Sequence, residues 1–347
     1  MTIERVTSVE VADDELALES TVRPRRLDEF AGQERVKENL SILIDAARQR
    51  SEPVDHVLLY GPPGLGKTTL ANIVAAEMGA QIRTTSGPAI ERAGDLAAVL
   101  TSLGSGDVLF IDEIHRLSHA VEEILYPAME DFALDVVLGK GPGARTVRLQ
   151  IEHVTVIGAT TRVGAITGPL RDRFGATYRL DYYTEPELEH ILRRSAELLD
   201  VALTDDAAAL VARRSRGTPR IANRLLKRVR DFAQVRGDGA VTAGLATDAL
   251  DLLEIDDRGL DAMDRQLMRA MAEHHGGGPV GLATMAATVS EPIVTIEDVV
   301  EPYLMQIGLL SRTQRGRQLT ASGWQHLGMT APASAGVSQP GLFDPSP

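Results

Sequence analysis

The chain has 347 residues, of which 44% are hydrophobic and 24% charged, as expected for a globular protein with two or three domains. Its formal net charge of -13 argues against a generally polycationic nucleic-acid binder, although a local basic patch would still suffice. Cysteine is absent, which excludes disulfides, thiol chemistry and zinc fingers. No apolar run reaches the ~18 residues that a membrane span needs, and the acidic start lacks the regions of a signal peptide, so we expect a cytoplasmic protein.

The first part of the chain is predicted to combine strands and helices. Residues 1–20 are expected to form a flexible acidic leader, and residues 21–182 an α/β domain. Within that domain a helical pattern over 32–50 precedes a strand, a glycine-rich loop and a helix over 56–78. Further buried strands are predicted within 107–113 and 153–162. Strands that alternate with helices predict a mostly parallel sheet covered on both faces.

A β-hairpin is predicted between the second and third of these strands. Apolar and β-branched residues flank the turn sequence Gly139–Gly143 within Val137–Leu149. An apolar hairpin at this place suits a surface for a partner protein, and the alternative is an internal lid.

The remaining chain divides into two further modules and a tail. Residues 183–255 have helical patterns only, whereas residues 256–330 have three helical patterns followed by two short strands, which is typical of a winged helix. Residues 331–347 are rich in Pro, Ser, Ala and Gly and are expected to be disordered. The segment between Pro302 and Phe343 contains no acidic residue and includes a group of three arginines, Arg312, Arg315 and Arg317. This group is the only plausible nucleic-acid surface that the composition indicates.

The segment Gly61–Thr68 satisfies the phosphate-binding pattern G-x-x-x-x-G-K-[ST]. Glycines let the backbone N–H groups curl around phosphates, and the start of the following helix adds its positive end. Lys67 supplies a charge at the β- and γ-phosphates, and the Thr68 hydroxyl completes a Mg²⁺ shell. The pattern therefore predicts ATP and Mg²⁺ as ligands.

Two carboxylates follow the predicted strand that ends near residue 112. Parallel sheets bind ligands at the carboxyl ends of their strands. Asp112 is expected to hold Mg²⁺, and Glu113 to orient and deprotonate the attacking water. An isolated acidic pair could equally be a solvated loop, so this interpretation depends on the glycine-rich loop beside it.

Three further polar groups have two interpretations each. A hydroxyl of Thr160 or Thr161 either senses the γ-phosphate or caps the strand end. Arg220 follows Thr218 and Pro219 in a first helical turn, where the helix dipole disfavours a cation unless an anion lies nearby. Arg171 and Arg173 would, on pattern alone, belong to a solvated face.

The motifs GPPGLGKTT, IDEIHRL, GATTR, GPLRDRFG and GTPRIANRLL, in this order and spacing, resemble those of AAA+ ATPases. More narrowly, they resemble the RuvB family of Holliday junction branch-migration ATPases from about Arg23 to about Thr320. The resemblance implies an AAA+ P-loop sheet with a β-hairpin insertion, an all-α lid domain and a C-terminal winged-helix domain. It also implies a hexameric ring around duplex DNA, with ATP bound between subunits.

The resemblance assigns roles to individual residues. The implied catalytic residues are Glu113, Lys67, Thr161 as the sensor, and Arg173 as the finger acting on a neighbour, with Arg171 as its alternative. The implied nucleotide-binding residues are Val22, Arg23, Gly64, Lys67, Thr68, Thr69, Asp112, Tyr183 and Arg220, of which Thr68 and Asp112 also hold the metal. The implied DNA-binding residues are Arg312 and Arg317 with Arg315 beside them. Glu291, Pro292 and Ile293 stand where relatives often place a basic residue, so one DNA contact is expected to be missing.

The family also implies partners. The hairpin is expected to dock RuvA through Leu134, Val136, Leu138, Val147 and Leu149. RuvC is a further partner by family only, and Gln339–Phe343 is similar to peptides that bind the bacterial sliding clamp. The implied function is ATP-dependent DNA translocation that drives branch migration with RuvA in recombination and repair.

Two other classes remain open at this point. A clamp-loader-type ATPase would end in a helical collar and not in a wing. A nucleotide-switched transcription regulator would recognise a specific DNA sequence, whereas arginines without clustered base-reading Asn or Gln favour phosphate contacts.

Overall fold

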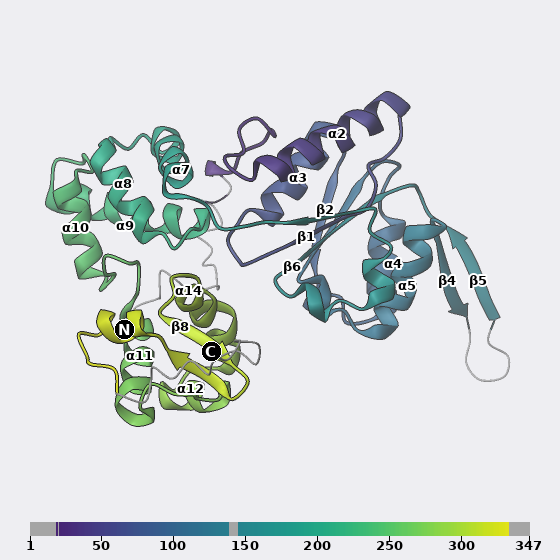
Figure 1. Cartoon of the computed structure of the whole chain (residues 1–347). Helices are drawn as coiled ribbons and strands as arrows, with labels where there is room; N and C mark the ends of the chain where they lie inside the picture. Colours follow the sequence, from purple (N-terminus) through teal and green to yellow (C-terminus); the bar gives the residue numbers. More distant parts are fainter. Residues whose placement is uncertain (1–18, 20, 139–144, 333–347) are drawn as a thin grey trace, which may run out of the picture.

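The computed structural model describes residues 19, 21–138 and 145–332. It consists of an α/β part, an all-helical part and a third part with a small two-stranded sheet (Figure 1). In the described residues no helix has the length and apolar character to cross a bilayer.

A parallel sheet forms the centre of the α/β part. Its five strands lie in the order β2-β3-β6-β1-β7, and all four pairings are parallel. The strands are β1 (Val57–Tyr60), β2 (Ile82–Ser86), β3 (Val108–Asp112), β6 (Thr155–Thr160) and β7 (Ala176–Arg179). The three inner strands are those predicted from their apolar runs. The edge strand β2 is mostly polar (IRTTS) and β7 mixes polar with apolar residues (ATYR), so neither forms the apolar run that reveals the inner strands.

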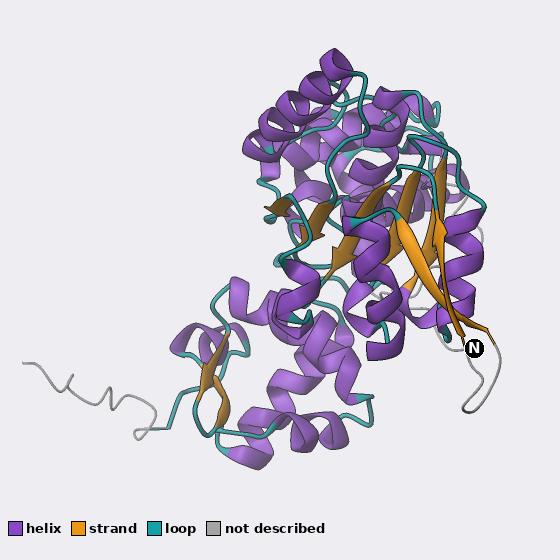
Figure 2. Ribbon diagram, turned by 90° about the vertical axis from the view of Figure 1, so that its right-hand side faces the viewer, coloured by secondary structure: helices purple, strands orange, loops and turns teal. Residues whose placement is uncertain are grey.

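Helices cover both faces of this sheet (Figure 2). One face packs against α2 (Glu34–Arg50) and α3 (Lys67–Met78), and this core continues into the helical part. The other face packs against α4 (Ala93–Thr101) and α5 (His119–Glu130). The predicted α/β sheet is thereby confirmed. Short helical turns complete this part, namely η1 (Gly87–Ala89), η2 (Ile114–Arg116), η4 (Val163–Ala165) and α6 (Gly168–Arg171).

The predicted hairpin consists of β4 (Ala133–Leu138) and β5 (Arg145–Gln150), which pair antiparallel. In Figure 1 it projects from the α/β part on the side away from the other two parts. Its turn at residues 139–144 lies outside the described residues.

The all-helical part consists of α7 (Glu185–Leu198), α8 (Asp205–Arg214), α9 (Pro219–Arg236) and α10 (Ala243–Leu252). Thr184 opens α7 with a capping box to Glu187, and Thr218 caps α9 by accepting the Ile221 N–H. The cap at Thr218 fixes where α9 starts and therefore where Arg220 lies.

The third part is a winged helix, as predicted. Its helices are α11 (Ala262–His275), α12 (Leu282–Thr288) and a third made of α13 (Ile293–Thr295), the π-helical turn η5 (Ile296–Val300) and α14 (Glu301–Gln306). The wing is the antiparallel pair β8 (Leu310–Thr313) and β9 (Gly316–Leu319), followed by the short helix α15 (Ala321–His326). These elements share a core of their own, and there is a wing where a clamp loader would have a collar.

Two buried arginines join the winged helix to the helical part. Arg216 donates from Nε to the Gly259 carbonyl at 2.7 Å, pairs with Asp264 and lies 5.0 Å from the Tyr303 ring centroid. Arg214 donates to the Ile255 carbonyl at 3.1 Å, at the end of the helical part, and to Asp257 Oδ1 at 2.6 Å, at the start of the next part. Gly259 has φ +72°, and an added Cβ would lie 2.5 Å from the Arg214 carbonyl oxygen. Glycine is therefore required where the chain passes from one part to the next.

His56 connects β1 to both a neighbouring strand and a helix. Its Nε2 lies 2.9 Å from the Met129 carbonyl, and its Nδ1 accepts the Val156 N–H at 2.9 Å. Nδ1 can accept this hydrogen bond only while it carries no proton. Burial lowers the pKa of His56 from its usual value of 6.5.

We predict that His56 makes the fold acid-sensitive. Because the pKa is lower in the folded chain, the unfolded chain binds more protons below about pH 6.5, and His56 contributes less stability as the pH falls. In urea unfolding at pH 7.5, His56→Leu, whose side chain can neither donate nor accept a hydrogen bond, should be less stable than wild type by about 2 kcal/mol, for two lost hydrogen bonds. At pH 5.5 this difference should shrink, and a difference that stays constant would contradict the assignment.

Candidate active site

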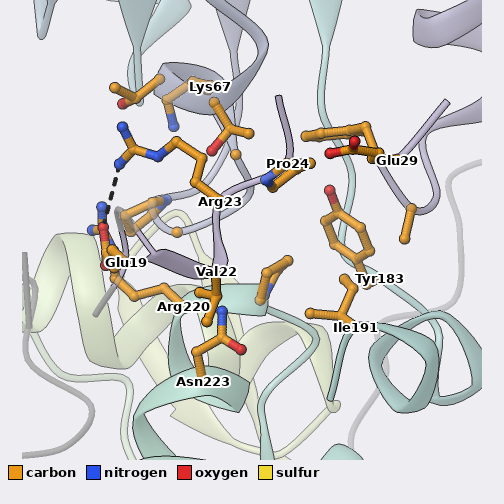
Figure 3. A pocket seen from close by; sticks show the side chains of 18 of the residues that line it. Glu19, Val22, Arg23, Pro24, Glu29, Lys67, Tyr183, Ile191, Arg220 and Asn223 are labelled. Carbon is orange, nitrogen blue, oxygen red and sulfur yellow. Dashed lines mark hydrogen bonds and ion pairs between the residues drawn. The ribbon is translucent and has the colours of Figure 1, made fainter. Parts of the chain in front are cut away.

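A cavity of about 330 Å³ lies between the α/β part and the helical part. Its lining comes from the glycine-rich loop, the end of β3, the segment before α7 and the start of α9. Figure 3 shows Lys67 from the loop and Arg220 from α9 among the side chains that line it.

The glycine-rich loop is shaped to surround a phosphate group. Gly64 and Gly66 have φ +79° and +99°, and no side chain caps the start of α3. The first N–H groups of α3 are thus available to an anion, as the helix dipole favours. Gly66 also faces the Phe30 ring, which an added Cβ would approach to 3.0 Å.

Lys67 is a buried cation in this cavity. Its Nζ donates to the carbonyls of Gly61 and Pro62, at 2.8 Å each. Burial lowers the pKa of Lys67 to about 8, although the Asp112 and Glu113 carboxylates oppose the shift. Burial removes the water that would stabilise the Lys67 charge, and the negative charge of a phosphate would stabilise it instead. The residues present therefore fit a nucleotide.

The two carboxylates lie where the sequence predicts them. β3 ends at Asp112, whose Oδ1 accepts the Glu113 N–H at 2.9 Å, and Glu113 has φ +48°. A non-glycine residue in this left-handed region carries backbone strain, which is common at functional sites. Burial raises the pKa of Glu113, and the neighbouring Asp112 adds to the shift. The raised pKa makes Glu113 a stronger base.

Of the two threonines, only Thr161 lines the cavity. Its hydroxyl donates to Glu113 Oε2 at 3.3 Å. Thr160 is fully buried beneath it, with its Oγ1 2.9 Å from His115 Nδ1. The structure thus brings Thr161 to the acidic pair and gives Thr160 a supporting place behind it.

Arg220 has the anion partner that its position in the first turn of α9 requires. Its Nε donates to Glu19 Oε1 at 3.0 Å, and Glu19 Oε2 lies 3.7 Å from Arg23 Nη2 (Figure 3). Glu19 belongs to the expected leader, yet its carboxylate lies in the cavity. The pairing spans 201 positions, which a local sequence pattern cannot reveal. The one available sign is that Glu19 stands four residues before Arg23, the spacing of a helical ion pair.

Apolar side chains and a tyrosine form another wall of the cavity. Val22 and Tyr183 are both buried, and the Tyr183 hydroxyl donates to the Leu65 carbonyl at 3.1 Å. Ile191 and Arg194 also line the wall, and Arg194 donates to the Val22 carbonyl at 2.7 Å. These two residues look from the sequence like ordinary members of the helix α7. The wall suits the flat apolar faces of a nucleotide base.

The metal would be held jointly with phosphates. Within the described residues there is no group of three His, Asp or Glu side chains placed to bind a metal. Thr68 and Asp112 both line the cavity, and Mg²⁺ commonly takes one or two protein oxygens together with phosphates. The donor set therefore fits the expected ion.

Arg173 lies outside the cavity of its own chain. Its guanidinium lies 4.3 Å from the Tyr126 ring centroid and donates to Glu130 Oε2 at 3.1 Å. Arg171 is exposed. Neither arginine can complete the site within a single chain in this arrangement.

The three wing arginines differ in exposure. Arg312 and Arg315 are exposed, as a phosphate contact requires. Arg317 is only 8% exposed and donates to both carboxylate oxygens of Glu301, at 3.0 and 2.8 Å. The expectation that Arg317 contacts DNA is corrected, because its guanidinium is occupied by this buried ion pair.

The hairpin presents part of the expected apolar surface. Val147 and Leu149 are exposed, at 41% and 44%. Leu134 is fully buried in the core beneath the sheet, which corrects its assignment as a partner contact. The side chains of Val136 and Leu138, like the segment Gln339–Phe343, lie outside the described residues.

Family models match nearly the whole described chain. The P-loop domain of the Holliday junction DNA helicase RuvB matches residues 22–180, the RuvB AAA lid domain 183–256 and the RuvB C-terminal winged-helix domain 257–328. The chain belongs to the RuvB family. As a member, it is an AAA+ P-loop ATPase of the Holliday junction DNA helicase type, which confirms the resemblance found in its motifs.

Solved RuvB structures agree with this assignment. The Holliday junction branch migration motor RuvB of Thermotoga maritima is 50% identical, with TM-score 0.82 over 90% of this chain and 100% of that chain. A lysine-to-arginine mutant of the same protein is 50% identical, with TM-score 0.83 over 90% and 99%. An arginine-to-alanine mutant is 49% identical, with TM-score 0.82 over 90% and 99%.

We predict that Glu19 competes with nucleotide phosphates for Arg220. Replacing Glu19 by Gln removes the carboxylate charge, so the affinity for a fluorescent ADP analogue should rise up to about fivefold, since a partly exposed ion pair contributes up to about 1 kcal/mol. Titration of wild type, Glu19→Gln and the exposed control Glu52→Gln would measure it. Unchanged or weaker binding by Glu19→Gln alone would contradict competition.

Proposed function

We propose that the chain is the ATP-driven motor that migrates Holliday junctions together with RuvA, acting as a homohexameric ring on duplex DNA in the cytoplasm. The observation that carries the ring is the split site. Lys67, Asp112, Glu113 and Thr161 gather in one cavity, while Arg173 lies outside it. A second copy of the chain would complete the site.

Within one subunit each residue of the cavity has a separate role in ATP hydrolysis. Lys67 exchanges its two carbonyl partners for the β- and γ-phosphates of ATP, and Arg220 exchanges Glu19 for phosphate oxygen. Mg²⁺, held by Thr68 and Asp112, would neutralise charge on the phosphates. Glu113 accepts the proton of the attacking water, and the Thr161 hydroxyl fixes the Glu113 carboxylate for that role.

Arg173 of a neighbouring subunit supplies the remaining positive charge. It lies outside the nucleotide cavity of its own chain, held against Tyr126 and Glu130 of α5. An arginine supplied in trans is worth about 10³- to 10⁵-fold in rate in other nucleotide hydrolases. A monomer should therefore hydrolyse ATP poorly.

DNA and RuvA would meet different surfaces. The exposed Arg312 and Arg315 suit sequence-independent contacts to phosphates. Val147 and Leu149 on the hairpin suit an apolar contact with RuvA. RuvC is a further proposed member of the complex. The sliding-clamp hypothesis concerns Gln339–Phe343, which lie outside the described residues.

The proposal predicts that ATP drives separation of a synthetic four-way junction with homologous arms. Wild type with RuvA, Mg²⁺ and ATP should yield duplex products. Glu113→Gln should bind ATP but hydrolyse it at least about 100-fold more slowly, because the base is lost, and should leave the junction intact. A gel assay of the labelled junction would measure the products.

The same assay separates the alternatives. Val147→Ser combined with Leu149→Ser should retain ATPase activity but lose the RuvA-dependent separation, whereas Ile42→Ser, an exposed control on α2, should behave as wild type. ATP hydrolysis with an intact, RuvA-bound junction would refute the motor. Binding to one defined operator sequence would support the transcription regulator.

We predict that Arg173→Ala still binds ATP but loses DNA-stimulated hydrolysis by about 10³-fold. Arg171→Ala serves as the matched comparison from the same segment. Mixing Arg173→Ala with Glu113→Gln subunits should restore part of the activity, because some interfaces then combine an intact base with an intact finger. Normal turnover by Arg173→Ala would move the finger to Arg171.

A further inference from the structure

An ion-pair cluster joins the end of the catalytic sheet to the winged helix. Arg162 comes directly after Thr161, and its guanidinium donates to Asp298 Oδ1 at 3.1 and 2.6 Å and to Glu297 Oε2 at 2.9 Å. Both acids lie in the π-helical turn η5 within the third helix of the winged helix. A π-helical turn is rare and often marks a functional position.

The backbone of Arg162 continues this connection toward the base. Its N–H donates to Thr160 Oγ1 at 2.9 Å, and that oxygen lies 2.9 Å from His115 Nδ1. His115 Nδ1 is also 3.2 Å from Glu113 Oε2. Contacts thus run without a gap from the winged helix to the carboxylate that activates water.

A second route reaches the same carboxylate from the adjacent residue. The Thr161 hydroxyl donates to the same Glu113 oxygen. Because Thr160, Thr161 and Arg162 are consecutive, a shift of the Arg162 side chain would move the peptide units on which both routes depend. General-base catalysis requires the carboxylate within hydrogen-bond reach of its proton, so such a shift would slow the reaction.

The winged helix also borders the phosphate loop itself. A small cavity beside the nucleotide site is lined by Pro63 and Gly64 from the loop and by Asp298 and Tyr303 from the winged helix. The two parts therefore meet at the catalytic edge of the sheet. The ion pairs are partly exposed, with Arg162 at 38% and Asp298 at 27%, so their value for stability is small. A role in positioning the catalytic residues explains better why these ion pairs lie at the catalytic edge of the sheet.

We propose that Arg162 is a positioning residue for the base Glu113, anchored by Asp298 and Glu297, through which the DNA-binding domain acts on ATP hydrolysis in its own subunit. The inference rests on the proposed function for its DNA dependence. Its geometric core, the link from η5 to Glu113, is independent of which DNA is bound.

The test measures kcat and KM for ATP with and without duplex DNA, and the affinity for a fluorescent ADP analogue. Arg162→Gln and Asp298→Asn should each lower kcat about tenfold, as expected for a misplaced general base, while KM and the ADP affinity stay within about twofold. Arg162→Lys, which keeps the charge but not the forked donors, should fall in between. Arg50→Gln, which breaks the exposed pair of Arg50 with Glu52, is the matched control and should match wild type.

The double variant decides whether the residues act as one unit. If they do, Arg162→Gln with Asp298→Asn should lose no more kcat than either single change. A multiplied loss of about 100-fold, or single variants with wild-type kcat, would overturn the proposal. A parallel loss of ADP affinity would also overturn it, because that indicates a disturbed cavity and not a misplaced base.

The two proposals fail differently. If wild type hydrolyses ATP without any response to DNA, the proposed function is in error, and the kcat comparison without DNA still tests the link. If wild type responds to DNA and the variants respond equally, only this inference fails.

Discussion

Burial of the Lys67 cation is the constraint around which the site is organised. An ammonium group that has lost its water needs opposite charge, and in this chain it has two backbone carbonyls and a carboxylate pair nearby. The carbonyls belong to the loop after β1 that would receive phosphate, and the carboxylates follow β3, which is separated from β1 in the parallel sheet by β6. The cation, the loop and the acids thus constrain one another, and a nucleotide phosphate together with Mg²⁺ would satisfy all three: the phosphate would pair with the cation and the loop, and the metal with the acids.

The fold was largely predictable because its strongest signals are local. The inner strands are continuous apolar runs, and the glycine-rich loop and acidic pair follow their strands directly in sequence. Helix caps such as Thr218 are likewise set by neighbouring residues. The edge strands β2 and β7 could not be predicted in this way, because exposed edges of a sheet carry polar residues. The helix α15 is too short to show a periodic pattern.

The site was predictable where spacing decides and unpredictable where distant segments meet. The place after a strand leaves Thr160 and Thr161 open, and only the motif resemblance selects Thr161. The partner of Arg220 is a residue 201 positions away, which neither spacing nor motif reveals. In the sequence Arg317 cannot be distinguished from its neighbours Arg312 and Arg315, and only the fold shows that it is paired with Glu301. A sequence can give the type of charge and its local frame, whereas burial depends on what the rest of the chain brings against it.

The hairpin has a consequence for how the protein meets its partners. It extends from the α/β part away from the winged helix, so the two surfaces face different surroundings (Figure 1). A protein that grips Val147 and Leu149 does not block Arg312 and Arg315, and DNA on the wing does not cover the hairpin. Neither partner has to leave before the other arrives. If the hairpin and the wing have the roles proposed for them, assembly can start from either side, with recruitment by a protein and engagement of DNA as independent steps.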